Sequence, residues 1–170
     1  MRARDVGRVL RRAARVARRA TTQRQPPGTA GPRPGAAAGP GPGARLGYAP
    51  VADDRADPGE VVWAWVPYEE DASQGKDRPV LVVGREGPLL LALQLTSQDH
   101  DRDAAQEARA GRHWVDVGSG GWDHRRRPSE ARVNRLLRLE PQAVRRTGAQ
   151  LDRQVFDRVV AQVRRHYPAL

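Results

Sequence analysis

The chain has 170 residues with 17 Gly, 14 Pro and no Cys, and its formal net charge at pH 7 is +10. This length suits one ordinary domain with a tail, and the lack of Cys excludes disulfides and thiolate metal sites. No apolar run reaches the roughly 20 residues that span a bilayer. Residues 1–58 carry 12 Arg against four acidic residues, whereas residues 59–170 are nearly balanced, so the net charge says little about the folded part.

The N-terminal third predicts little regular structure. Residues 1–20 place small apolar side chains at helical spacing among eight arginines. Such a basic amphipathic segment can contact a membrane surface or RNA phosphates, while the plainer interpretation is a disordered basic extension, because small side chains bury little area. The segment lacks the apolar core of a secretory signal, which favours a cytoplasmic protein. Residues 21–58, rich in Pro, Gly and Ala, predict a linker without secondary structure.

The pattern changes near Pro58 and Gly59, and residues 59–170 predict a folded domain. Five segments have the length and apolar pattern of β-strands. They are residues 60–68, 79–84, 89–97, 113–118 and 133–140. The first alternates and predicts a half-buried strand, while the second and third are continuous apolar runs joined by a short hairpin connection. Residues 98–112 predict a long loop with a helical turn, and residues 118–130 predict a second loop.

The last predicted element is a helix. An apolar stripe runs from Leu151 to Val163 at helical spacing, and Arg164 and Arg165 follow where positive charge favours the helix dipole. Five short strands and a packed helix predict a mainly β fold, built as a small and strongly bent sheet or barrel with a C-terminal α-helix.

Several short motifs occur in order along this domain. Gly-Glu-Val-Val-Trp begins at Gly59, Gln-Gly-Lys-Asp-Arg-Pro-Val-Leu-Val-Val begins at Gln74, and Leu-Thr-Ser ends at Ser97; SEARVNRLLRL from Ser129 and GAQL from Gly148 follow. The ordered set resembles the MazF/PemK family of bacterial toxins of type II toxin–antitoxin systems. The resemblance implies an SH3-like β-barrel with a C-terminal helix, a homodimer, and a cognate antitoxin protein as partner.

The resemblance also implies an activity, namely endoribonuclease cleavage of single-stranded RNA without a metal or other cofactor. The ribose 2′-OH attacks the adjacent phosphate and leaves a 2′,3′-cyclic phosphate. Arg78 and Thr96 match the family's catalytic positions, and a guanidinium suits this role because it binds two phosphate oxygens. Ser97, Gln74 and Lys76 are candidate substrate-binding residues. The alternative for Arg78 is a structural ion pair with a carboxylate, for which the candidates are Glu69, Glu70 and Asp77.

The second loop adds further candidates. Arg125, Arg126 and Arg127 are candidates for holding RNA phosphates, or are simply solvated. His113 and His124 are candidate general bases, although scattered histidines are also common at protein surfaces. The two tryptophans of this region, Trp114 and Trp122, are candidates for stacking on bases or for the core. The His and Asp residues lack a metal-ligand spacing, so no metal site is predicted.

The chain departs from the family pattern in the loop before Arg78. Residues 71–74 read Asp-Ala-Ser-Gln where the family commonly has Gly-Ser-Glu-Gln, and Lys76 and Asp77 replace small or neutral residues. Asn134 stands where the later motif has Asp, and the insertion at residues 98–112 is longer and more acidic than usual. These departures favour an alternative function, a non-catalytic nucleic-acid-binding or regulatory module on the same fold.

Overall fold

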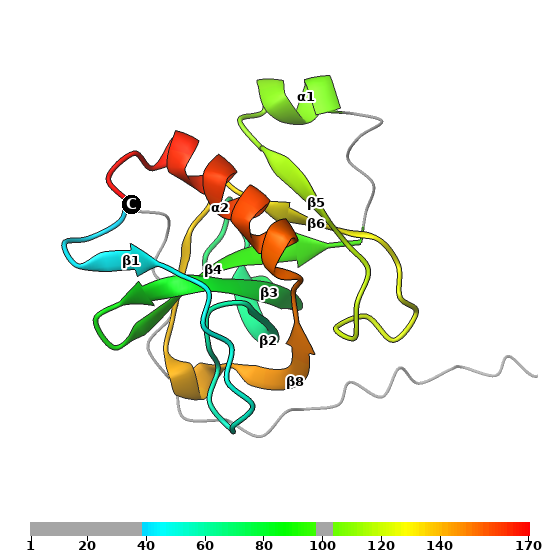
Figure 1. Cartoon of the computed structure of the whole chain (residues 1–170). Helices are drawn as coiled ribbons and strands as arrows, with labels where there is room; N and C mark the ends of the chain where they lie inside the picture. Colours follow the sequence, from blue (N-terminus) through cyan, green and yellow to red (C-terminus); the bar gives the residue numbers. More distant parts are fainter. Residues whose placement is uncertain (1–38, 98–103) are drawn as a thin grey trace, which may run out of the picture. The chain divides into compact units, whose positions relative to one another are not determined.

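The fold is an antiparallel sheet of eight strands with a C-terminal helix (Figure 1). The computed structural model describes residues 39–97 and 104–170, so the predicted segment 1–20 lies outside the described residues. The strands are β1 (Ala44–Leu46), β2 (Glu60–Pro67), β3 (Gly75–Glu86), β4 (Leu89–Thr96), β5 (Trp114–Gly118), β6 (Ser129–Arg132), β7 (Leu137–Leu139) and β8 (Arg145–Gln150). The helices are α1 (Ala104–Arg109) and α2 (Arg153–His166), with a 3₁₀ turn at Pro141–Ala143. The predicted mainly β fold is confirmed.

The strand order places the two longest apolar strands at the centre of the sheet. The order is β5-β6-β4-β3-β2-β8, with β1 also paired to β3 and β7 to β4. The predicted hairpin between β3 and β4 is confirmed, with Glu86 opposite Leu89. No pairing joins β5 to β8 among the described residues, so the closed SH3-like barrel stays a prediction.

Both faces of the sheet are buried, and each carries its own core. One core lies between the sheet and α2, and joins Val61, Leu81 and Leu93 to Phe156 and Val159 of the helix. The other is built from the strands themselves with loop residues at its border. Its members are Ala56, Val62, Ala64, Val66, Val80, Val82, Leu90, Ala92, Leu137 and Leu139, with Val144 packed against it. No helix of the described residues contributes to this second core.

The prediction of a half-buried β2 is confirmed in part. Val62, Ala64 and Val66 are buried on one face of the strand. On the other face Val61 is buried in the core with α2, but Trp63 is only partly buried and Trp65 is 49% exposed.

The prediction that residues 21–58 lack secondary structure is wrong for β1. Leu46 pairs with Gly84 of β3, and a side chain at position 84 would meet the backbone carbonyl of Arg45. Tyr48 donates a hydrogen bond from its hydroxyl to the carbonyl of Leu151 at 2.9 Å and packs its ring on Phe156. The lack of a side chain at Gly84 allows β1 to lie close to β3. The ordered structure therefore begins before the predicted boundary at Pro58 and Gly59.

Two strands lie where no strand was predicted, and one predicted strand is shorter. β6 falls at the end of the predicted loop 118–130, and β8 is polar and contains Gly148, so neither has an apolar run. The chain turns at residues 133–134, which leaves only β7 of the strand predicted at 133–140. The helical turn predicted within residues 98–112 is confirmed as α1.

The predicted C-terminal helix is confirmed as α2. The Asp152 side chain caps it by accepting hydrogen bonds from the backbone N–H groups of Gln154 and Val155. Its apolar stripe is buried on the sheet, with Phe156, Val159, Val160 and Val163 in the core. No helix among the described residues is long and apolar enough to cross a membrane.

The contact between β1 and β3 gives a test of the ordered boundary. Gly84→Ala should lower the free energy of unfolding by about 1–3 kcal/mol, because the added methyl group meets the backbone of β1. Urea denaturation of the full chain measures this loss. Gly121→Ala is the matched control, since a side chain there meets its nearest neighbour at an ordinary 3.7 Å. Equal stability of the two variants would contradict the placement of β1.

Candidate functional site

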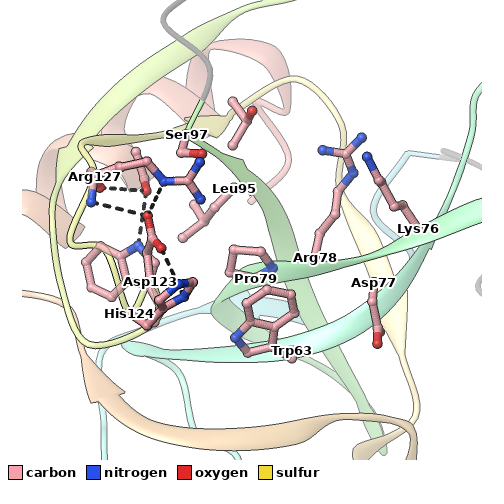
Figure 2. Close-up of a pocket in the computed structure, with 13 residues that line it drawn as sticks. Trp63, Lys76, Asp77, Arg78, Pro79, Leu95, Ser97, Asp123, His124 and Arg127 are labelled. Carbon is pink, nitrogen blue, oxygen red and sulfur yellow. Dashed lines mark hydrogen bonds and ion pairs between the residues drawn. The ribbon is translucent and has the colours of Figure 1, made fainter.

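The candidate site is a cleft that opens where β4 leaves β3. The two strands pair as far as Val80 and Gln94. Beyond that point β4 turns away and pairs with β6, with Leu95 opposite Ala131, whereas β3 continues alongside β2 as far as Gly75. A cavity of about 340 Å³ lies between the diverging strands (Figure 2).

The Arg-Pro step of the sequence lies at this point of divergence. Pro79 has no backbone N–H, so it is tolerated where β3 has a partner strand on one side only. Proline also keeps the residue before it in extended backbone, and Arg78 is accordingly in the strand, opposite Ala64. Pro79 thus has two effects. It is compatible with the end of the β3–β4 ladder, and it keeps Arg78 in the extended conformation that places it at the cleft.

Two cationic side chains line one wall of the cleft. Lys76 and Arg78 are alternate residues of β3, so they project from the same face of the strand. Figure 2 shows them side by side, with Asp77 pointing the opposite way. Both side chains line the cavity, and neither makes a hydrogen bond or an ion pair with another described residue.

In the described part of the chain Arg78 forms none of the ion pairs that the structural alternative proposes, and other arginines bind two of the three candidate carboxylates. Asp77 accepts a hydrogen bond from Arg145 at 2.6 Å, and Glu69 accepts two from Arg132 at 2.7 and 2.9 Å. The third candidate, Glu70, forms no ion pair with Arg78 in the described part of the chain.

Hydroxyl groups line the facing wall. Thr96 is the last residue of β4 and lies opposite Glu130 of β6, and Ser97 follows it. Both line the same cavity as Arg78. The cleft therefore brings together the guanidinium and the hydroxyls that the sequence predicts as one site.

The third wall is a loop that the buried Asp123 organises. Its carboxylate accepts hydrogen bonds from the Arg127 side chain at 2.7 Å and from the backbone N–H groups of Arg125 and Arg127. The bond from the Arg127 side chain is the largest of the effects that lower the pKa of Asp123 from 3.8 to about 2. Arg127 lines the cleft, but its charge is already paired, as Figure 2 shows.

The two candidate histidines lie in different places. His124 lines the cleft, its side chain is 85% exposed, and its Nδ1 lies 3.8 Å from Oδ1 of Asp123. His113 does not line the cleft; its ring packs on that of His166 with 4.7 Å between centroids. Burial, and then the charge of His113, lowers the pKa of His166. Of the two, only His124 is placed to act on a ligand in the cleft.

Other predicted site residues lie outside the cleft. Gln74 belongs to the turn between β2 and β3, where its amide donates to Asp71 at 2.8 Å; hydrogen bonds from Ser73, and then from Gln74, lower the pKa of that aspartate. Arg125 and Arg126 are exposed on the third wall but do not line the cavity.

The tryptophans also differ from the sequence interpretation. Trp122 is a core residue, 4% exposed, that donates from its indole to Ser129 at 3.1 Å. Trp114 lies outside the cleft and donates to Glu107 at 3.0 Å. Trp63 lines the cleft instead. Trp63 was not predicted as a site residue, because its place in an alternating strand indicated a core role.

The later family motif contributes a structural residue rather than a cleft residue. Asn134 accepts a hydrogen bond from the backbone of His113 at 3.1 Å and donates one to the carbonyl of Gly111 at 2.5 Å. Its amide thus fixes the start of β5. Among the described residues, no three His, Asp or Glu side chains gather in a way that suits a metal ion.

Comparison with known families matches this arrangement to one of them. Residues 57–167 match the family model described as a PemK-like, MazF-like toxin of type II toxin–antitoxin systems. The match covers well over half of the chain, from β2 to α2, and includes all three walls of the cleft. A comparison with curated proteins found no match. The family resemblance noted in the sequence is confirmed.

The role of Asp123 predicts a pH-dependent stability. Its pKa is about 2 in the folded chain, below the ordinary 3.8, so its charge stabilises the fold above pH 3.8 and this contribution is lost as the pH falls toward 2. Asp123→Asn should therefore unfold at lower urea concentration than wild type at pH 7, with a difference that vanishes on acidification. Asp54→Asn, at an exposed position, should match wild type throughout. If Asp123→Asn is still less stable than wild type against urea at pH 2, by as much as at pH 7, this role is contradicted.

Proposed function

Because the chain belongs to the PemK-like, MazF-like toxins of type II toxin–antitoxin systems, we propose that it is an endoribonuclease that cuts single-stranded RNA in the cleft between β3 and β4. The observation that supports this most directly is the Arg78 guanidinium, which pairs with no carboxylate of the described residues, in the same cavity as the hydroxyls of Thr96 and Ser97. Such a cation suits a ligand that carries phosphates.

The proposed reaction is an internal transfer of the phosphate. The ribose 2′-oxygen bonds to the adjacent phosphorus as the bond to the 5′-oxygen breaks, which leaves a 2′,3′-cyclic phosphate and a 5′-hydroxyl. Arg78 binds the two non-bridging oxygens, where negative charge increases in the transition state. A guanidinium remains protonated at physiological pH, so Arg78 is not the base. Thr96, with Ser97 beside it, orients the 2′-OH or bonds to the phosphate.

We assign the general base to His124. Its exposed imidazole lines the cavity, and the carboxylate of Asp123 lies near its Nδ1. The neutral ring can take the 2′-OH proton, and the ion pair with Asp123 stabilises the imidazolium that results. Proton return to the 5′-oxygen, directly or through water, balances the step. Lys76 supplies a further positive charge for the RNA backbone on the same wall.

Family membership implies an antitoxin partner and an RNA substrate in general terms. We propose that the antitoxin acts by covering the cleft, that the toxin is a homodimer, and that it works in the cytoplasm without a metal. A non-catalytic nucleic-acid-binding or regulatory module is the alternative outcome of the tests below, since the loop before Arg78 departs from the family pattern.

Removal of the Arg78 guanidinium tests the proposed reaction. The full-length wild type should cleave a mixed-sequence single-stranded RNA in the presence of EDTA, and Arg78→Ala should lose about 100-fold or more of kcat/KM, because it lacks the phosphate ligand of the transition state. End analysis of the fragments should find a 2′,3′-cyclic phosphate. Arg158→Ala removes an exposed arginine from α2 and should cleave like wild type. RNA binding without cleavage by folded wild type would instead favour the binding module.

The base assignment predicts a loss of cleavage in one histidine variant. His124→Asn should lose about 100-fold of kcat/KM at neutral pH, because it lacks the group that takes the 2′-OH proton. Cleavage rates under single-turnover conditions measure this loss. If His113→Asn loses activity and His124→Asn keeps it, the assignment is wrong.

A further inference from the structure

A second cavity lies on the other side of Arg78. Its volume is about 140 Å³, and Arg78 lines both this cavity and the cleft. Three more arginines line it, namely Arg112, Arg132 and Arg135. A chain of phosphates bound by Arg78 in the cleft would therefore meet further guanidinium groups in the next hollow along the surface.

Protein carboxylates already bind the three arginines of this second cavity: Glu107 binds Arg112, and Glu69 binds Arg132 and Arg135. Glu69 accepts hydrogen bonds from both terminal nitrogens of Arg132, at 2.7 and 2.9 Å. The Nε of Arg135 lies 3.8 Å from the same carboxylate. This two-pronged geometry, in which one planar guanidinium binds two oxygens of one anion, is also the geometry in which arginine binds phosphate.

The two arginines need an anion because they are withdrawn from water. The side chains of Arg132 and Arg135 are only 7% and 8% exposed. Burial lowers the pKa of Arg135, and the charge of Glu69 opposes this effect. A buried cation left without a counter-ion is costly, so Glu69 stabilises the pair when no other anion is present.

Glu69 is held far less firmly than the arginines it binds. It lies in the turn between β2 and β3, outside both strands, and its side chain is 42% exposed. Arg135, in contrast, also donates to Gln94 at 2.9 Å and to the carbonyl of Pro67 at 2.7 Å. If Glu69 turned out to solvent, these two hydrogen bonds would still hold the Arg135 guanidinium in place.

We propose that Arg132 and Arg135 form a second phosphate subsite for the RNA backbone, which Glu69 occupies until RNA displaces it. This inference rests on the proposed function and extends the RNA path beyond Arg78. Tyr68 and Trp114 line the same cavity, which suits a nucleotide better than a free anion. The carboxylate thereby acts as an internal competitor that lowers the affinity for RNA.

The adjacent Glu70 provides a matched control for the test. It belongs to the same turn and lines the same cavity, yet it forms no ion pair with an arginine in the described part of the chain. Glu69→Gln and Glu70→Gln change the net charge equally. Only Glu69→Gln removes the competitor from Arg132.

Binding is measured with the full chain and a single-stranded RNA in which every 2′-OH is methylated, so that it cannot be cleaved. Glu69→Gln should bind this RNA about tenfold more tightly than wild type, whereas Glu70→Gln should change the affinity by about twofold or less. A role of Glu69 in stability alone would leave the affinity unchanged or weaken it. Equal tightening in both variants would indicate a general charge effect and overturn the subsite.

A second measurement separates this inference from the proposed function. Inorganic pyrophosphate should raise the Tm of Glu69→Gln by several degrees more than that of Glu70→Gln, because the vacated arginines gain an anion. Equal shifts would overturn the subsite even if wild type cleaves RNA. If wild type cleaves no RNA but pyrophosphate favours Glu69→Gln, the phosphate subsite stands and the proposed reaction fails.

Discussion

The divergence of β4 from β3 is the constraint on which the site depends. After Val80 and Gln94 the two strands no longer pair, since β4 takes β6 as its partner. Pro79 lies just before Val80 in β3, where no residue of β4 is paired with it. Its lack of a backbone N–H is therefore tolerated there. The interior strands can thus remain buried on both faces, while their ends expose a guanidinium on one wall and hydroxyls on the other. Fold and site come from the same split in the ladder.

Charge pairing then decides which cations remain for a ligand. The described part of the chain is rich in arginine, but most of these side chains near the cleft have partners: Asp123 binds Arg127, Asp77 binds Arg145, and Glu69 binds Arg132. Lys76 and Arg78 stand apart because strand alternation turns Asp77, their neighbour in sequence, to the opposite face. Local sequence therefore does not indicate which charges are neutralised; the sheet does.

Much of the fold was predictable, and the reasons for the failures are specific. Continuous apolar runs located β3 and β4, and helical spacing located α2, because burial leaves a periodic record in the sequence. β8 leaves no such record, since it is a polar strand at the end of the sheet, and β1 is hidden in a segment rich in Pro and Gly. The site was partly predictable from the ordered motifs around Arg78 and Thr96. Trp63 and Asp123 were not, because their place depends on tertiary contacts.

The hairpin of β2 and β3 contributes residues to both cavities. In the turn between these strands, Asp71 accepts hydrogen bonds from Ser73 and Gln74. The residues that depart from the family's loop sequence thus form hydrogen bonds with one another within the turn. Glu69 lies at the start of that turn and Arg78 follows its end in β3. A phosphate that displaced Glu69 from Arg132 would act on the same hairpin that carries Arg78. The acidic residue that neutralises the arginines in the free protein is thus placed to respond to the ligand that replaces it.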